Sequence, residues 1–316
     1  IVHLHHLEGY FLDVQMLTKY LKENKINTVW TIHDCWPFTG HCTHFTVAGG
    51  DKWKTECNSC PQKKSYPYSA LFDHSKKLYG IKKALFSSWE ELRIVNVSKW
   101  MMEMTAQSLF RNADRTLIYN GIDTDVFLPL SQKTQLFDIR QKHGLNHKFI
   151  ILGVASRWGK QKGLDLFLEL SAALSAKYAI VLVGLTPKQI KKMPSRIVGV
   201  ERTQSKEELR EYYAQADVFL NLSQEETMGL VTVEAMSCGT PAIVCNSTAS
   251  PELVNSECGL VINNADVKNI VDAIDIICHK DKQAYSKSCR KYVEANFKKE
   301  KMNEEYYKLY KSLMSE

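Results

Sequence analysis

The 316-residue sequence lacks any apolar stretch close to the ~20 residues that a membrane-spanning helix requires. It also lacks the Gly-x-x-x-x-Gly-Lys-Ser/Thr loop of P-loop nucleotidases and the Gly-x-Gly-x-x-Gly fingerprint of dinucleotide-binding proteins. No internal repeat or low-complexity tract interrupts it. Charged residues make up 24% and hydrophobic residues 44% of the chain, as in ordinary globular proteins, and the length allows two domains.

Positive charge is concentrated in one segment. The net charge is +6, and residues 52–83 hold eight lysines against Glu56 and Asp73, so this segment accounts for the whole excess. It contains no arginine and no recognition motif, so a nucleic-acid partner is not expected. The pattern favours a solvated, lysine-rich helix face. The alternative is a surface that contacts an anionic membrane or a lipid-diphosphate acceptor.

The nine cysteines fall into two groups. Five are scattered through the C-terminal half and are typical of buried thiols in a reducing cytoplasm: Cys238, Cys245, Cys258, Cys278 and Cys289. The other four, Cys35, Cys42, Cys57 and Cys60, lie within 26 residues of a loop-like segment. Cys57-x-x-Cys60 has the spacing of half a zinc knuckle, and Cys35 with Cys42 is a candidate for the other half. The sequence leaves structural zinc and free thiols open, whereas a disulfide is less favoured in a cytoplasmic protein.

A histidine-rich stretch opens the sequence. His3 and His5 alternate on an expected strand, His6 follows, and His33 and Asp34 come after the next expected strand. Alternating histidines on one strand face can bind a metal, so a metal-dependent hydrolase that uses this cluster is a rival interpretation. No further Asp or His follows at the short spacing that such enzymes need, which weighs against it.

Apolar runs alternate with amphipathic segments along the whole chain. Expected strands cover residues 1–5, 28–33, 93–98, 115–119, 149–155, 179–184, 197–200, 217–221, 241–245 and 259–262. Expected helices cover residues 13–24, about 68–88, 99–111, 162–176, 187–192, 206–215, 229–238, 266–280, 281–295 and 299–314, and a linker runs from Asn120 to about Ser131. This alternation predicts two α/β regions with parallel sheets and right-handed crossovers. Ser205 and Glu208 predict a capping box at the start of the helix at 206.

Two glutamates in the segment 226–241 give the strongest functional signal. Seven residues separate Glu226 from Glu234, and Gly229 is expected to open a helix that Gly239 and Pro241 end. The helix is largely apolar and is therefore expected to be buried, where a carboxylate needs a partner. Its N-terminus suits a phosphate, and carboxylates beside the phosphates suit hydroxyls. The pattern indicates a nucleotide-sugar site.

A second motif supports this interpretation. The apolar run 149–155 reads as a buried strand and leads into Ser156-Arg-Trp-Gly-Lys-Gln-Lys-Gly163. Arg157 and Lys162 thus flank a glycine-bearing turn at the carboxyl end of a strand, where open α/β sheets bind their ligands. Two fixed cations there are able to neutralise a diphosphate leaving group.

These motifs resemble those of the family 4 glycosyltransferases, which have the GT-B fold. Residues 149–262 are similar to the donor-binding half of the family. The matching pieces are the G-R-x-x-x-x-K-G element from Gly153 to Gly163, the segment 216–220, and the segment from Glu226 to Pro241. Upstream, residues 119–127 resemble the interdomain N-G-I-D-x-x-x-F segment, and residues 32–34 resemble the H-D element of the N-terminal domain.

The resemblance implies a role for each matching residue. Arg157 and Lys162 are expected to contact the donor diphosphate, and Glu226 to contact hydroxyls of the transferred sugar. Glu234 is expected to bind the ribose hydroxyls. His33 is expected to lie near the sugar and the acceptor. With His33, the residues Arg157, Lys162 and Glu226 form the expected catalytic set.

The resemblance also implies how the donor is held and how it reacts. The backbone N–H groups of Met228, Gly229 and Leu230 are expected to help bind the diphosphate. The family retains anomeric configuration through an oxocarbenium-like transition state and needs no metal or other cofactor for catalysis. Fixed cations therefore take over the stabilisation of the leaving group.

The domain organisation follows from the same resemblance. We expect two Rossmann-like domains with parallel sheets that face each other across a cleft. Residues 1–128 form the N-terminal acceptor-side domain with a Cys-rich insertion at 35–60, residues 129–290 form the nucleotide-sugar-binding domain, and residues 291–316 form a helix that packs back toward the N-terminal domain. Because family members carry several βα units before the equivalent of Ile1, the N-terminal domain is expected to be truncated.

The predicted function is transfer of a sugar from a nucleoside-diphosphate sugar to a glycan or lipid-linked acceptor in polysaccharide biosynthesis. The enzyme is expected in the cytoplasm, at the inner face of the membrane. The alternative from another class is a non-catalytic donor-binding remnant that has lost its acceptor half.

Overall fold

The computed structural model describes residues 1–9, 11–67, 72–130 and 135–315. The chain divides into two compact units. The first unit comprises Ile1–Tyr119 and Met302–Glu316, and the second comprises Asn120–Lys301. The division after Tyr119 falls where the predicted linker begins. No helix in the described part of the chain is both long and apolar enough to cross a lipid bilayer.

The first unit is built on a four-stranded parallel sheet in the order β1-β2-β3-β4. The strands are β1 (Val2–Leu4), β2 (Thr28–Ile32), β3 (Leu92–Asn96) and β4 (Asp114–Leu117). The helices are α1 (Val14–Glu23), α3 (Ser75–Phe86) and α4 (Lys99–Gln107), with two short helices, η1 (Trp36–Phe38) and α2 (Lys52–Thr55). The expected helix at 68–88 thus begins at Ser75, and its predicted start at 68–71 lies outside the described residues.

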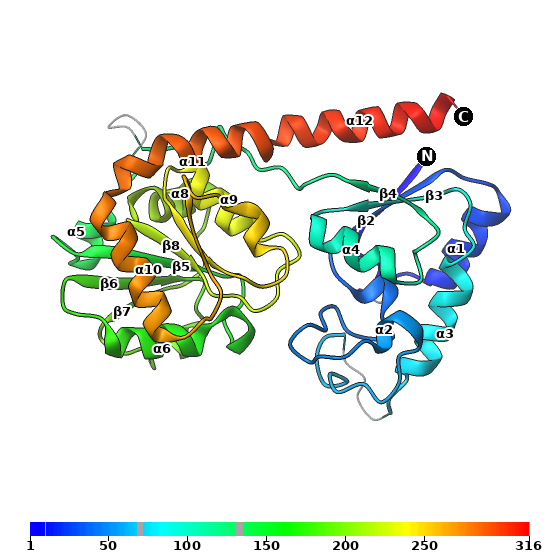
Figure 1. Ribbon diagram of the computed structural model, residues 1–316, viewed down its shortest axis with the longest axis horizontal. Helices are drawn as coiled ribbons and strands as arrows, with labels where there is room; N and C mark the ends of the chain where they lie inside the picture. Colours follow the sequence, from blue (N-terminus) through cyan, green and yellow to red (C-terminus); the bar gives the residue numbers. More distant parts are fainter. Residues whose placement is uncertain (10, 68–71, 131–134, 316) are drawn as a thin grey trace. The chain divides into compact units, whose positions relative to one another are not determined.

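Both faces of this sheet are covered, because successive residues of a buried strand point to opposite sides. On one face Trp30 of β2 packs edge-on against Phe86 and Phe110, with ring centroids 5.1 and 5.8 Å apart. On the other face Val29 belongs to a cluster with Leu313 of α12 (Lys299–Ser315). The chain therefore returns at its C-terminal end to complete the first unit (Figure 1).

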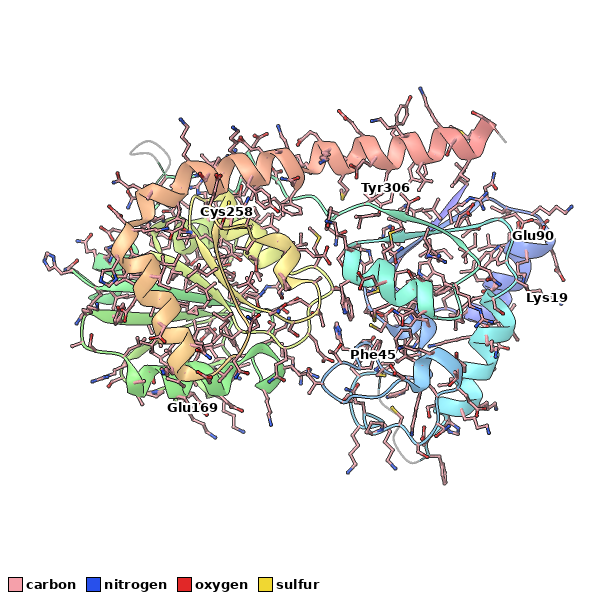
Figure 2. All side chains as sticks on the ribbon, viewed as in Figure 1. Lys19, Phe45, Glu90, Glu169, Cys258 and Tyr306 are labelled. Atoms are coloured by element: carbon pink, nitrogen blue, oxygen red, sulfur yellow. The ribbon has the colours of Figure 1, made fainter. Side chains whose placement is uncertain are left out.

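Hydrogen bonds fix α12 on the first unit. The hydroxyl of Tyr306, labelled in Figure 2, lies 2.7 Å from Thr31 Oγ1. The Tyr310 hydroxyl lies 2.6 Å from His3 Nδ1, and Asn27 donates from Nδ2 to the Leu313 carbonyl at 2.8 Å. These polar contacts join the ends of β1 and β2 to the helix, while the apolar side chains between them supply the packing.

The second unit contains a six-stranded parallel sheet in the order β10-β9-β8-β5-β6-β7. Its strands are β5 (Phe149–Val154), β6 (Tyr178–Val183), β7 (Ile197–Val200), β8 (Val218–Asn221), β9 (Ala242–Cys245) and β10 (Gly259–Ile262). Its helices are α5 (Ile139–His143), η2 (Lys160–Lys162), α6 (Leu164–Ala173), α7 (Pro187–Ile190), α8 (Lys206–Gln215), α9 (Leu230–Ser237), η3 (Ser250–Leu253), α10 (Val267–Lys280) and α11 (Lys282–Asn296). The predicted α/β class with parallel sheets is confirmed in both units.

One local prediction is wrong in its detail. The Ser205 side chain accepts from the Glu208 backbone N–H, as a capping box requires. The Glu208 carboxylate, however, accepts at 2.7 Å from the backbone N–H of Gln204, one residue too early to close the box. A complete capping box forms instead at the start of α7, between Thr186 and Gln189.

Candidate functional site

The strand order of the second unit defines where a ligand is able to bind. The chain runs from β5 outward through β6 to β7 and then returns to β8 on the other side of β5. The strand order therefore reverses between β5 and β8, and such a switch point leaves a crevice outside the carboxyl ends of the two strands. Both predicted motifs follow these two strands, since residues 156–163 leave β5 and residues 222–229 leave β8.

The two loops pack against each other closely. Gly163 has a φ of +73°, and a Cβ at this position would lie 2.6 Å from Leu222 Cβ and 2.8 Å from the Leu222 carbonyl oxygen. The backbone N–H of Gln224 donates to the Gln161 carbonyl at 3.0 Å. Because only glycine combines the left-handed conformation with this close approach, Gly163 sets the position of the loop that carries Lys162.

Lys162 and Glu226 form an ion pair across these loops. Lys162 Nζ donates to Glu226 Oε1 at 2.6 Å, and the two side chains are 34% and 12% exposed. The backbone N–H of Glu226 donates to Thr248 Oγ1 at 2.8 Å, and its carbonyl accepts from Ala249 at 3.2 Å. The loops after β5, β8 and β9 thus together hold the Lys162 ammonium group in a defined place at the switch point.

The N-terminus of α9 lies next to this pair in the sequence. Gly229 is the N-cap residue with a φ of +86°, and no side chain caps the helix there. Helix N-termini without a side-chain cap present N–H groups to an anion. Met228 is buried, and its sulfur accepts from the Asn120 backbone N–H at 3.2 Å, while Leu230 is exposed. The predicted helix start at Gly229 is confirmed, and the N–H groups of 228–230 are located at its first turn.

Glu234 has a different environment from Glu226. Its Oε2 accepts from the Tyr213 hydroxyl of α8 at 2.8 Å. Burial raises the pKa of Glu234 to about 7, although the Tyr213 hydrogen bond and the charge of Lys206 act in the opposite direction. The two predicted glutamates therefore differ. Glu226 is paired with the Lys162 cation, whereas Glu234 changes its charge near neutral pH.

A cavity of about 610 Å³ opens at the carboxyl ends of β5 and β6. It is lined by Val154, Ala155, Ser156, Val183, Gly184, Arg202, Thr203, Gln204, Ser205, Lys206, Leu209 and Val231. Val231 stands three residues before Glu234 on α9, so the two side chains share a face of that helix. The sequence interpretation did not single out Arg202 or Lys206. Both residues follow β7, a third strand of the same sheet, and this position in the sequence was the signal that could have marked them as site residues.

The structure thus joins some of the predicted residues and separates others. Lys162 contacts Glu226 directly, and Glu234 faces Tyr213. Arg157 is exposed in the loop after β5. It thus offers an exposed cation in the same loop as Lys162.

His33 belongs to the first unit and sits among other histidines. Its Nε2 lies 2.9 Å from His5 Nδ1, and its ring stacks on His6 with the centroids 4.9 Å apart. Burial, together with His6, His5 and His3, lowers the pKa of His33 to about 4. The His33 imidazole is therefore neutral at pH 7 and is able to donate or accept one hydrogen bond.

Two members of the histidine cluster, His6 and Asp34, lie with Glu8 in a group whose possible ligand atoms are within 4.8 Å of one another, and a metal-dependent site there stays a prediction. Both ring nitrogens of His3 are engaged, Nε2 by Thr31 at 2.8 Å and Nδ1 by Tyr310. His6 instead approaches two carboxylates, Glu8 at 2.9 Å and Asp34 at 3.8 Å. Burial and the charge of Glu8 raise the pKa of Asp34 to about 7, so the Asp34 carboxyl group is partly protonated at neutral pH. The contacts among His6, Glu8 and Asp34 are therefore also explained without a bound metal.

The expected solvated lysine face of α3 is wrong at Lys82. This residue is buried, and its Nζ donates to the carbonyls of Trp36 at 2.6 Å and Thr39 at 3.0 Å. Nζ also lies 3.5 Å from the centre of the Trp36 ring. Burial lowers the pKa of Lys82 to about 7. One of the eight lysines thus has an internal role, since it joins α3 to two carbonyls of the loop after β2.

Comparisons with known proteins identify the family. Residues 137–299, which are slightly more than half of the chain, match the family described as "Glycosyl transferases group 1". The chain belongs to this family. The matched residues include β5 to α11 of the second unit, so the family match covers the sheet that carries the candidate site.

Individual relatives and structures agree with this assignment to the group 1 glycosyl transferases. The chain is 26% identical over 279 residues to a protein named "Putative colanic acid biosynthesis glycosyl transferase WcaC" from Escherichia coli K12, and it spans 66% of that protein's length. Its structure resembles that of sucrose-phosphate synthase from Thermosynechococcus elongatus (TM-score 0.72, 19% identity, 99% of this chain and 73% of the other). It also resembles Anabaena Alr3699/HepE in complex with UDP (TM-score 0.69, 16% identity, 94% and 76%). These likenesses confirm the predicted GT-B fold class.

Proposed function

We propose that the protein transfers a sugar from a nucleoside-diphosphate sugar to a glycan or lipid-linked acceptor in polysaccharide assembly, with retention of anomeric configuration. The observation that carries the proposal is the Lys162–Glu226 pair, held at the switch point beside the uncapped start of α9. The relative named for colanic acid biosynthesis and the similar structure determined with UDP support the same reading.

Each group has a physical task in this scheme. The donor diphosphate occupies the first turn of α9, where the N–H groups of 228–230 and the helix dipole favour negative charge. Lys162 stabilises the charge that develops on the leaving diphosphate, and Arg157 swings in from the rim. Glu226 holds the Lys162 cation in place and offers its second oxygen to a sugar hydroxyl. Such preorganised charge is usually the largest single contribution to catalysis.

The cavity beside Glu234 accommodates the nucleoside. Its volume of about 610 Å³ is in the usual range for small-molecule sites. Glu234 binds the ribose hydroxyls, and the residues 202–206 contact the base. Transfer proceeds without a metal cofactor, because Lys162 and Arg157 supply the positive charge. Donor binding in the presence of a chelator is the direct measurement for this part of the proposal.

The pH dependence of donor affinity tests the role of Glu234. Its pKa of about 7 in the free protein means that the carboxylate, which accepts hydrogen bonds from hydroxyls, is the minor form at pH 6 and the major form at pH 8. Donor affinity is therefore expected to rise roughly fivefold to tenfold between these values. Glu234→Gln should remove this rise, as calorimetric titration at several pH values will show. A Gln variant that keeps the wild-type pH dependence would refute the role.

The raised pKa of Glu234 also predicts how the stability of the free protein depends on pH. The folded state holds the Glu234 proton up to a pH of about 7, whereas the unfolded chain releases it near the ordinary glutamate pKa of 4.5. The folded state therefore binds more protons in this window, and its free energy of unfolding falls as the pH rises from about 4.5 to 7. Urea titrations of wild type and Glu234→Gln in this window should diverge in that direction.

A donor screen tests the proposal as a whole. A true donor at about 100 times its dissociation constant stabilises the folded state by about 2.7 kcal/mol. Uridine and guanosine diphosphate sugars should be compared by thermal unfolding with chelator present, followed by detection of sugar transfer or donor hydrolysis. Binding with no turnover would favour the alternative of a non-catalytic donor-binding remnant. Absence of binding to every nucleoside-diphosphate sugar would contradict the proposal.

A further inference from the structure

The segment between η1 and α3 is unusually long for its small content of regular structure. Of the described residues in 39–74, only the four of α2 are helical, and none forms a named strand. Loops longer than about 12–15 residues without secondary structure are uncommon in compact domains. Aromatic rings attach this segment to the core of the first unit: Trp53 lies 4.8 Å from Phe45, which Figure 2 labels, and 5.6 Å from Phe38 of η1.

Three thiols and one imidazole line one cavity where this segment folds back. A cavity of about 320 Å³ is lined by Cys42, Cys57, Cys60 and His41, among other residues. The backbones approach very closely beside it, because a Cβ at Gly40 would lie 2.7 Å from Cys57 Cβ and 2.4 Å from the Ser75 carbonyl oxygen.

Hydrogen bonds hold the thiol-bearing backbone in position. Thr39 donates from its hydroxyl to the Cys42 carbonyl at 2.7 Å. The Cys60 backbone N–H donates to the Asp73 carboxylate at 2.7 Å, and Asp73 also accepts from the Ser75 N–H at 2.8 Å. The cysteines are therefore attached to the start of α3 rather than carried on a free loop.

We propose that Cys42, Cys57 and Cys60 bind one zinc ion, with His41 as the fourth ligand. Three thiolates and one imidazole are a common tetrahedral set for structural zinc. Cys35, which the sequence grouped with these three, is fully buried in the core of the first unit and is not among the residues that line the cavity. The proposal therefore replaces Cys35 by His41 in the ligand set.

The chemistry of the cluster suits a bound divalent cation. Cysteine binds zinc as the thiolate and histidine binds it as the neutral imidazole, so zinc binding at this cavity displaces one proton from each thiol.

Metal binding requires the ligand atoms to move closer together. With a Zn–S bond of about 2.3 Å, two sulfur ligands of a tetrahedral site lie about 3.8 Å apart. In the described part of the chain, the one group of three or more such ligand atoms within 4.8 Å of one another is His6, Glu8 and Asp34. The three thiols must therefore move toward one another into the cavity that they line, and His41, whose Nε2 lies 3.3 Å from the Ser65 carbonyl oxygen, must turn toward them.

Metal analysis of the full chain tests the proposal. Protein purified without chelator should contain about one zinc per chain by plasma mass spectrometry. Cys57→Ser and Cys60→Ser should each lose most of the zinc, and Cys278→Ser, in the second unit, should retain it. Zinc that remains in both variants would show a metal bound elsewhere, for example at His6, Glu8 and Asp34, and would overturn the proposal.

Two measurements on the unsubstituted chain keep the proposal falsifiable if the serine variants do not fold. Titration with an organomercurial should release the zinc after about three thiols have reacted. Cobalt added to metal-depleted protein should give the absorption of cobalt–thiolate charge transfer, and this signal should weaken but persist in His41→Ala. A chain that contains no zinc and binds no cobalt, or whose cysteines pair as disulfides, would exclude the site. Zinc lost in Cys35→Ser but kept in His41→Ala would exclude the ligand set.

The proposal predicts the direction in which zinc affinity changes with pH. Because three protons are displaced, the apparent zinc affinity should fall as the pH is lowered, by up to roughly 1,000-fold per pH unit below the thiol pKa values. An affinity that is constant between pH 6 and 8 would contradict thiolate ligation. These measurements use no sugar donor, so their outcome is independent of the proposed transferase activity.

Discussion

Replacing Lys162 by alanine should lower kcat by roughly 10²- to 10³-fold, the usual effect of removing one preorganised group that stabilises transition-state charge. The reason is the placement of its ammonium group, which Glu226 holds at 2.6 Å beside the start of α9. The free energy of unfolding should change by less than about 1 kcal/mol, because the pair is partly exposed and such pairs contribute little to stability. Turnover at saturating donor and urea unfolding measure the two effects separately.

Lys160→Ala is the matched control. Lys160 lies two residues earlier in the same short helix, η2, and is exposed. Its loss removes the same charge from the same loop and should leave kcat within a factor of about two, since an exposed charge more than a few ångströms away is screened. A Lys162→Ala enzyme with the wild-type rate would show that the diphosphate assignment is wrong.

Arg157→Ala should also reduce turnover. The effects of Glu226→Gln and Lys162→Ala on turnover should be non-additive, because the two residues act as a pair.

Gly163→Ala should destabilise the fold by roughly 2–4 kcal/mol. The alanine pays the cost of a left-handed backbone conformation, and its Cβ meets Leu222 at 2.6 Å. Relief of that clash pushes the loop after β5 away from the loop after β8, so Lys162 moves relative to Glu226. We expect donor affinity to fall as well. Chemical denaturation and donor titration of the same preparation will measure both quantities.

Gly144→Ala separates backbone strain from crowding. Gly144 follows α5 with a φ of +66°, and a Cβ built there has no atom within 4 Å. This variant should cost only about 1 kcal/mol and should not affect the donor. If Gly163→Ala is no more destabilising than Gly144→Ala, the close contact with Leu222 does not set the geometry of the site.

The sequence predicts on which elements the parts of the candidate site lie, but not their contacts. Arg157 and Lys162 were placed after one buried strand, and Glu226 and Glu234 at the opening of a helix after another, because apolar runs and glycines mark these boundaries locally. The Lys162–Glu226 pair spans 64 residues of sequence. It forms because β8 lies beside β5 in the sheet, and strand order of this kind depends on the packing of the whole unit.

The remaining misses have the same origin. Lys82 looks like its exposed neighbours in sequence, yet it turns inward and donates to two carbonyls of a distant loop. Glu208 fits the capping-box pattern, but its carboxylate accepts from the N–H of Gln204 instead of that of Ser205. For the proposed zinc site, spacing alone does not distinguish Cys35 from His41; both are buried, but His41 lines the cavity and Cys35 does not. Local patterns thus fix element type, while tertiary packing decides partners.

The position of α12 bears on how the protein is made. Residues 1–119 are synthesised before residues 302–315, yet Val29, Val95 and Ile118 acquire their cover from Leu313 and its neighbours. The nascent chain therefore carries an uncovered sheet face until α12 has been made, a state in which chaperones bind and aggregation begins. A nonsense codon just before α12 would consequently expose the first sheet while the second sheet stays intact.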